Sequence, residues 1–492
     1  MGFCIKWNRT MANQRITFGE WLPDQPSVTG ALMKADNVYS RAIGYGGIPL
    51  AVDYTQNASE PLNNVVAGKN PDGSTTIFAG SQTNLYKLDS ADMSLDDVSG
   101  ATYGTPTDQR WRFTQFGNRI IAANGFDKLQ GWLLGTSTAW ADLAADAPAS
   151  RYVTVVRDFV VTGHIGTTNP FRVKWSALND ETSWTDSATT QSDYQEIPDG
   201  GSIVGITGGE FGLVFLDRSI YRMSYVGSPL VFQFDNISRN LGCYEANSII
   251  QYQGMSFFLA DDGFYACDGQ NVVSIGGEKV DRYFFADVDE EYLHNMSAAI
   301  DPIKNLVIWA YPSKGQGGNV NKLLIYNFQT KKWSSGTTDV DKVASSSSPS
   351  TTLEGLDAIS SSIDALGSSL DSRIWLGGKL LFAGVRGNKV VTFTGANSTA
   401  TIQTGELSAE NRKTAITLVQ PIVDNGSCDV AVFSRDLLTT QVIFGSSTSA
   451  DSENRVSVRS MGRYHRLQFS PTGANWDSII GADVEIVPMG GR

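Results

Sequence analysis

The chain has 492 residues, of which 18% are charged, 10% are aromatic and 49 are glycine, a composition typical of a turn-rich all-β protein. Its 38 lysines and arginines against 51 aspartates and glutamates leave a formal net charge of −13, which argues against tight, sequence-independent binding to a phosphate backbone. A total charge does not exclude a locally basic patch. Single cores rarely grow beyond about 250 to 300 residues, so the length predicts two or three domains.

Residues 1–74 are predicted to form an extended N-terminal arm. From residue 12 onward the arm is rich in Pro, Asn, Asp and Gly, and it contains one clear extended run at residues 48–52, which could donate a strand to the next domain. The first residues lack the apolar stretch of a secretory signal, and no segment approaches the length of a membrane span. We therefore expect a soluble product made in a cytoplasm. Met11 reads as a more natural start, which would make residues 1–10 an upstream extension.

One sequence pattern recurs seven times between residues 75 and 395: a short apolar run, a Gly or Asp turn, and a second apolar run that ends at an aromatic residue. The runs are too short and too rich in β-branched and aromatic residues for helices. The units begin near seven residues: Ile77, Phe113, Val153, Ile203, Ile249, Ile300 and Ile374. The mean step of about 50 residues is typical of propeller blades. The sequence thus predicts an all-β fold with a β-propeller of six or seven blades; an array of β-sandwiches is the alternative.

The propeller is assigned to residues 75–333 and 373–398, and the residues between them, 334–372, are predicted to be an insertion. Residues 334–352 are rich in Ser and Thr and too polar to form a core of their own. Six apolar residues then recur at steps of three and four, which places them on one helix face: Leu353, Leu356, Ile359, Ile363, Leu366 and Leu370. This stripe favours a short amphipathic segment lying on its own propeller, with a contact between subunits as the alternative.

Residues 399–492 change character again and contain about six alternating apolar runs, such as those at 430–433, 442–444 and 484–487. They are predicted to form a small C-terminal β domain.

No catalytic, cofactor-binding or metal-binding residue is predicted. The three histidines, His164, His294 and His465, lie in separate segments without a second metal-type residue at ligand spacing, and each is interpreted as a local hydrogen-bonding residue. The four cysteines are widely scattered and form no C-x-x-C pair, which is typical of a reduced compartment. Nucleophile-elbow, zinc-protease, P-loop and dinucleotide motifs are absent from the sequence.

Two acidic clusters remain as candidates for chemistry, because a propeller glycosidase needs two carboxylates across a central pocket. Asp261 and Asp262 precede Gly263 and indicate a hairpin turn. The densest acidic group consists of four residues: Asp287, Asp289, Glu290 and Glu291. This group could bind a divalent cation, but it lacks the alternating ligands and central glycine of a calcium loop, so a solvated surface is favoured. We therefore expect no enzyme activity.

Several sequence segments resemble segments of the tail proteins of short-tailed bacteriophages, which are described as nozzle, tail hub or packaged-DNA stabilisation proteins. These segments lie at residues 152–161, 174–180, 209–215, 219–227, 232–235, 262–265, 279–285 and 296–301. The resemblance extends over about residues 12–490 and is densest from 151 to 312. The family pattern includes no catalytic residues, so none is transferred to this chain.

The resemblance implies a structural virion protein: a β-propeller subunit of a homohexameric ring that lies below the portal and adaptor in the tail. Such a ring lines the exit channel, retains the packaged genome and allows its ejection. DNA would pass an acidic lumen without sequence-specific binding. Because the centre of one propeller is filled or narrow, the duplex would pass between subunits. The implied location is the virion tail, after assembly in the bacterial host cytoplasm. The alternative is a carbohydrate-active or receptor-contacting propeller of the same tail.

Overall fold

The computed structural model describes residues 12–348, 380–408, 412–443, 445–473 and 475–489, together with residues 362, 369 and 378. Within these residues the fold is almost entirely β, with a single α-helix, α1 (Asp281–Asp287), and three 3-10 turns, η1 (Ser27–Thr29), η2 (Ala246–Ser248) and η3 (Glu290–Asn295). None of the helical segments in the described part of the chain is long and apolar enough to cross a bilayer.

Antiparallel sheets of four strands follow one another along the chain. The first contains β6 (Leu62–Lys69), β7 (Thr75–Ser81), β8 (Leu85–Leu88) and β9 (Leu95–Asp97), and the second contains β10 (Arg112–Phe116), β11 (Arg119–Ala123), β12 (Gln130–Leu133) and β13 (Ala141–Asp142). The third contains β14 (Ser150–Val156), β15 (Phe159–Ile165), β16 (Asn169–Trp175) and β17 (Asp193–Glu196).

The fourth sheet contains β18 (Ile203–Thr207), β19 (Gly212–Leu216), β20 (Ile220–Gly227) and β21 (Val231–Ser238), and the fifth contains β22 (Ile250–Tyr252), β23 (Met255–Leu259), β24 (Phe264–Cys267) and β25 (Val272–Ser274). Next come β26 (Ser297–Asp301), β27 (Leu306–Pro312), β28 (Val320–Asn327) and β29 (Lys332–Thr337), which begin a larger sheet. The last sheet contains β30 (Lys342–Ser347), β31 (Leu380–Arg386) and β32 (Lys389–Thr392).

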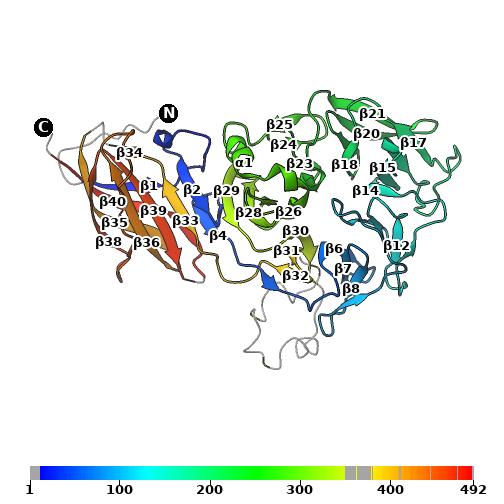
Figure 1. Ribbon diagram of the computed structural model, residues 1–492, viewed down its shortest axis with the longest axis horizontal. Helices are drawn as coiled ribbons and strands as arrows, with labels where there is room; N and C mark the ends of the chain where they lie inside the picture. Colours follow the sequence, from blue (N-terminus) through cyan, green and yellow to red (C-terminus); the bar gives the residue numbers. More distant parts are fainter. Residues whose placement is uncertain are drawn as a thin grey trace.

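These sheets lie around a common centre, with the first strand of each sheet on the inside (Figure 1). First strands contact one another in chain order from β6 through β10 and β14 to β18, and from β22 through β26 to β30, which in turn contacts β6. Second strands such as β19 and β27 are buried at every residue, because neighbouring sheets cover both of their faces. Such strands appear in the sequence as continuous apolar runs, which is why the repeat was detectable. The region is a propeller-like all-β fold.

A strand from the N-terminal arm completes the last sheet. Strand β5 (Val52–Asp53) pairs antiparallel with β32, so that Asp53 faces Val391. The Asp53 carboxylate also forms ion pairs with Lys389 Nζ at 2.6 Å and with the Arg386 guanidinium. Sheet pairing between residues more than 300 positions apart thereby joins the two ends of the series.

The sheets extend further along the chain than we expected. The first sheet begins at Leu62, inside the segment assigned to the arm, and Ile77 lies in its second strand. Strands β29 and β30 reach into the segment assigned to the insertion. Serine suits β30 because a small side chain lets it lie close to β26: Ile300 N donates to Ser345 Oγ at 2.9 Å. Ile374 and all six residues of the predicted apolar stripe lie outside the described residues.

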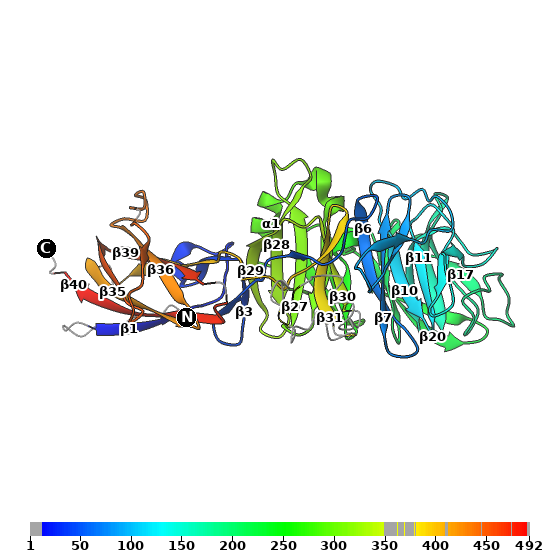
Figure 2. The ribbon, with the colours of Figure 1, turned by 90° about the horizontal axis from the view of Figure 1, so that it is seen from below.

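Both ends of the chain build a second, two-sheet unit, which we call the C-terminal β unit. One of its sheets contains β3 (Val38–Ser40), β4 (Tyr45–Gly47), β40 (Ser478–Pro488), β35 (Thr414–Asp424) and β38 (Val456–Gly462), with β1 (Ala12–Thr17) paired to β40. The other contains β2 (Leu32–Asp36), β33 (Thr401–Thr404), β39 (Tyr464–Thr472), β36 (Ser427–Arg435) and β37 (Thr448–Ser449), with β34 (Leu407–Ser408) paired to β39. Figure 2 shows this unit beside β29.

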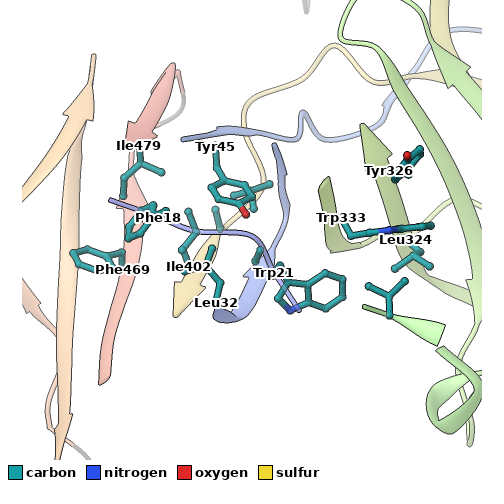
Figure 3. Close-up of a cluster of buried hydrophobic side chains, with 14 of the residues drawn as sticks. Phe18, Trp21, Leu32, Tyr45, Leu324, Tyr326, Trp333, Ile402, Phe469 and Ile479 are labelled. Carbon is teal, nitrogen blue, oxygen red and sulfur yellow. The ribbon is translucent and has the colours of Figure 1, made fainter. Parts of the chain in front are cut away.

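The second of these sheets is continuous with β26–β29, because β2 pairs with β29 and forms a ten-stranded sheet. At the junction Asn37 N donates to Ser335 O at 2.9 Å, and Thr337 N donates to Asn37 Oδ1 at 2.7 Å. One cluster of buried side chains also runs through both units (Figure 3), including Phe469, Ile402, Trp21, Leu324 and Trp333. The propeller-like region and the C-terminal β unit therefore share a sheet and a core.

The arm also holds helix α1. The Asp24 carboxylate accepts hydrogen bonds from Arg282 N at 2.9 Å and Tyr283 N at 2.8 Å, in the first turn of the helix. These amides have no partner within the helix, so a carboxylate from a distant segment replaces the usual N-cap side chain.

Asp281, the first residue of α1, predicts an unusual pH dependence of stability. Its side chain is buried and accepts a hydrogen bond from Phe264 N at 3.2 Å. Gly263 and Gly276 leave the space that it fills, since a Cβ at either position would lie 2.2 or 2.0 Å from the carboxylate. Burial raises the pKa of Asp281 to about 6 from its usual 3.8, although the Phe264 N–H acts in the opposite direction.

A raised carboxyl pKa means that the fold favours the protonated form. The stabilisation is complete below about pH 4 and is lost as the pH rises through about 6. Two pKa units correspond to about 3 kcal/mol, so between pH 4 and 7 the unfolding free energy of the unaltered chain should fall by up to about 3 kcal/mol relative to Asp281→Asn. Urea denaturation at several pH values measures this. Asp268→Asn is the opposite-sign control, because backbone N–H groups of Asn271 and Gln270 lower the pKa of Asp268. Parallel pH profiles for the unaltered chain and Asp281→Asn would contradict the prediction.

Candidate functional site

A small pocket lies at the centre of the propeller-like region, between the first strands of its sheets. Its volume is about 180 Å³. The lining residues come from β6, β10, β14, β18 and the segment before β22, and include Asn64, Arg112, Phe113, Tyr152, Gly205 and Thr207. The lining surface is mostly polar, with Arg112 as its charged residue.

Side chains that precede or begin the first strands form a hydrogen-bond network beside this pocket. Arg110 donates to Met296 O, and Arg112 NH2 donates to Asn247 Oδ1 at 2.6 Å. Asn247 Nδ2 in turn donates to His294 O at 2.9 Å. Arg110 precedes β10 of the second sheet and Arg112 begins it, whereas Asn247 precedes the fifth sheet and Met296 precedes β26. Sheets that are not neighbours in the series are therefore linked across the centre.

Positive charge dominates this end of the centre. Burial, and then the charge of Arg112, lowers the pKa of Arg110. Lys342, the first residue of β30, has its pKa lowered to about 8, first by burial and then by the charge of Arg110. Among the described residues, no carboxylate forms an ion pair with Arg110, Arg112 or Lys342 within 4.0 Å. The nearby carboxyls are Glu245, whose pKa is raised by burial, and Asp341, whose charge acts on Lys342.

The Arg112 guanidinium has capacity for further hydrogen bonds. It lies 5.0 Å from the centroid of the Tyr152 ring, a cation–π geometry that fixes its plane. Only its NH2 group has an acceptor among the described residues, namely Asn247. The Nε and NH1 groups are therefore able to donate hydrogen bonds to a ligand in the pocket, and their geometry suits a planar or tetrahedral oxyanion.

The predicted acidic clusters occupy other places. Asp261 and Asp262 lie in the turn between β23 and β24, where Asp262 Oδ2 accepts a hydrogen bond from Tyr265 OH at 2.8 Å. Asp287 ends α1 and its Oδ2 accepts from Tyr311 OH at 3.0 Å, while Glu290 and Glu291 are exposed in η3. Asp289 precedes η3. Across the described ranges, no group of three or more His, Cys, Asp or Glu side chains is arranged to hold a metal ion.

The three histidines lie apart from one another. His164 Nδ1 is 3.1 Å from Ile203 O, and His465 Nε2 is 2.9 Å from Thr414 Oγ1. Burial lowers the pKa of both rings, so both are neutral near pH 7. His294 contributes its carbonyl oxygen to the central network.

Sequence reasoning named Phe113, Val153 and Ile249 of the central pocket as starts of repeat units, but it did not single out the charged residues beside them. Arg110 and Arg112 flank Trp111 in a way that resembles many surface strands, and Glu245 and Lys342 lie more than 130 residues away in the chain. The available signal was a charged residue at the start of each of two first strands. This signal indicates a shared site only once the sheets are known to surround a common centre, because that arrangement brings the starts of the first strands together.

Comparisons with known proteins give little further information. No family model matches the chain, and no curated protein matches it. Among solved structures, the extracellular domain of a hybrid two component system from B. thetaiotaomicron is 12% identical with a TM-score of 0.40; the match covers 77% of this chain and 44% of that one. The computationally designed Ika8 protein is 11% identical over 77% of this chain and 98% of its own, with a TM-score of 0.37. A chain of a mitotic checkpoint complex is 9% identical over 72% of this chain and 94% of its own, with a TM-score of 0.39. These likenesses are too distant to support an inference about function.

Proposed function

We propose that the chain is a structural subunit of a bacteriophage tail, one copy in a homohexameric nozzle or hub ring that lines the DNA exit channel. The observation that carries the proposal is the ten-stranded sheet that runs from β26 to β37. Because the two units share this sheet and one core, the subunit is a stiff block with two differently shaped ends. A ring subunit needs such a block to hold its neighbours at a fixed rotation.

The finer architecture belongs to the same proposal. Counting β26–β29 as one unit, the described residues form seven four-stranded units, and the last of them is completed by β5. We therefore infer a seven-bladed propeller closed by the N-terminal arm. The resemblance of the sequence to short-tailed phage tail proteins supports the same architecture and the location in the virion.

The central network supports the proposed genome path. Arg110 and Arg112 bond across the centre of the propeller-like region, which leaves a pocket of about 180 Å³. Duplex DNA accordingly passes between the six subunits, in a channel that retains the genome without sequence-specific contacts. The formal charge of −13 favours sliding over tight binding. The portal and adaptor are the proposed partners, and the subunit acts without a cofactor or catalytic residues.

Imaging of the intact tail tests this function. Electron microscopy of tails carrying a tagged copy of this chain should place six copies around the tail axis, with the central hole between subunits. A monomer in solution is compatible with this result, because the portal or adaptor can template the ring. Localisation of the chain in a peripheral fibre, or as a single copy, would refute the proposal. Nanomolar affinity for duplex DNA at physiological salt would also refute it.

A further inference from the structure

We infer that the central pocket is a binding site for a small oxyanion, a phosphate or carboxylate group held by Arg112 with Arg110 and Lys342 beside it. This inference goes beyond the proposed structural role and does not depend on it. It concerns a site inside one subunit and can be tested on the isolated chain.

The first support for the anion site is an excess of positive charge beside the central pocket. Arg110 is only 8% exposed, and its guanidinium bonds to backbone carbonyls, which carry no compensating charge. Arg112 bonds to an amide oxygen of Asn247. Two acidic groups lie near these cations: Glu245 Oε1 accepts a hydrogen bond from Asn247 N at 2.9 Å, and Asp341 Oδ2 accepts one from Gly387 N at 2.6 Å. Buried charges are normally paired, and the three cations Arg110, Arg112 and Lys342 outnumber the two carboxyls near them, Glu245 and Asp341, which leaves room for an anion.

The second support is the fixed geometry of Arg112. Its NH2 group is bonded to Asn247 and its plane is held against Tyr152, so the guanidinium is oriented before any ligand arrives. Its remaining N–H groups have no acceptor among the described residues, although Arg112 lines the pocket. A guanidinium in this state is suited to carboxylate or phosphate, because its N–H groups match the spacing of two oxygens.

The size of the pocket limits the ligand. Sites for drug-sized molecules have volumes of about 300 to 1,000 Å³, and this pocket has about 180 Å³. The ligand is therefore an inorganic oxyanion or a small organic acid rather than a nucleotide. Phe113, Tyr152 and Ile206 give the pocket an apolar side, and Thr207 supplies a hydroxyl. Inorganic phosphate fits the polar part of this lining, and the ring of a small acid such as benzoate would lie against the apolar side.

Thermal unfolding of the full-length chain tests the site. Sodium phosphate and sodium benzoate are titrated separately, with sodium chloride used to keep the ionic strength constant. At least one of them should raise Tm along a saturable curve, because a ligand that binds only the folded state stabilises it. The two titrations distinguish a phosphate group from a carboxylate group. Isothermal titration calorimetry then gives the affinity.

Two variants and a control identify the site. Arg112→Gln should weaken binding by about tenfold or more, since hydrogen bonds to charged groups are the strong class. Lys342→Gln, whose amine has no hydrogen-bond partner among the described residues, should weaken it by about threefold through lost charge alone. The control is Arg172→Gln, which removes a surface arginine paired with Glu196 at 2.5 Å and should leave binding unchanged.

Lys342→Gln keeps the test valid if Arg112→Gln fails to fold, which near-ultraviolet circular dichroism would show. The proposal is overturned if neither anion gives a saturable shift beyond that of chloride. Equal shifts in the unaltered chain, Lys342→Gln and Arg172→Gln would also overturn it, because the effect would then be one of general salt.

Discussion

Replacing Glu406 with glutamine is expected to lower the free energy of unfolding by about 3 to 5 kcal/mol. The Glu406 side chain is 1% exposed and pairs with two arginines, through Arg435 NH2 at 2.7 Å and Arg466 Nε at 2.6 Å. These arginine side chains are themselves only 11% and 21% exposed. Removal of the carboxylate leaves two guanidinium groups next to each other without the carboxylate that pairs with both. Stability falls because a buried charge that has lost its partner is unfavourable.

Urea denaturation, followed by far-ultraviolet circular dichroism, measures the loss. Glu453→Gln is the matched control, because Glu453 and its partner Arg455 are 63% and 49% exposed. An exposed pair contributes between about 0 and 1 kcal/mol, so this control should stay close to the unaltered chain. If Glu406→Gln loses no more stability than Glu453→Gln, the three-residue cluster does not hold the C-terminal β unit together.

Replacing Trp21 with alanine should reduce stability by about 3 to 5 kcal/mol and loosen the junction between the two units. Trp21 is 2% exposed and belongs to the cluster that runs through both units. Its ring packs edge-on against Tyr283 at 5.2 Å, and its Nε1 donates to Met33 O at 3.3 Å. Alanine at this position would leave a cavity beside β2, the strand that joins the two halves of the ten-stranded sheet (Figure 3).

Hydrogen exchange followed by mass spectrometry locates this effect. In Trp21→Ala, amides of β2, β29 and β33 should exchange faster, because local opening at the junction requires less free energy. Trp184→Ala is the matched control: Trp184 is fully buried in a separate cluster that includes Ile121 and Val160. This control should lower stability without faster exchange in β2 or β33. Equal exchange at the junction in both variants would show that Trp21 has no special role there.

The sequence by itself determined the strands and their repetition. Strands such as β19 and β27 are covered on both faces, so their residues are apolar in a continuous run. Such a run can be recognised from the local sequence alone. The turns could also be predicted from the local sequence. Asp261, Asp262 and Gly263 indicated a hairpin turn, and in the structure they lie in the turn between β23 and β24. The local patterns were therefore sufficient to predict the all-β class and its repeat of about 50 residues.

Only the tertiary structure decided which distant segments pair. The placement of β5 against β32, of β2 against β29 and of β1 against β40 joins residues that are about 300 or more positions apart. Strand partners are selected by the fit of whole faces and edges, which a local pattern does not specify. The same reason applies to the central pocket and to Glu406. A charged residue next to a strand resembles a surface residue in the sequence, until folding of the chain buries it among other charges, as happens to Arg110 and Glu406.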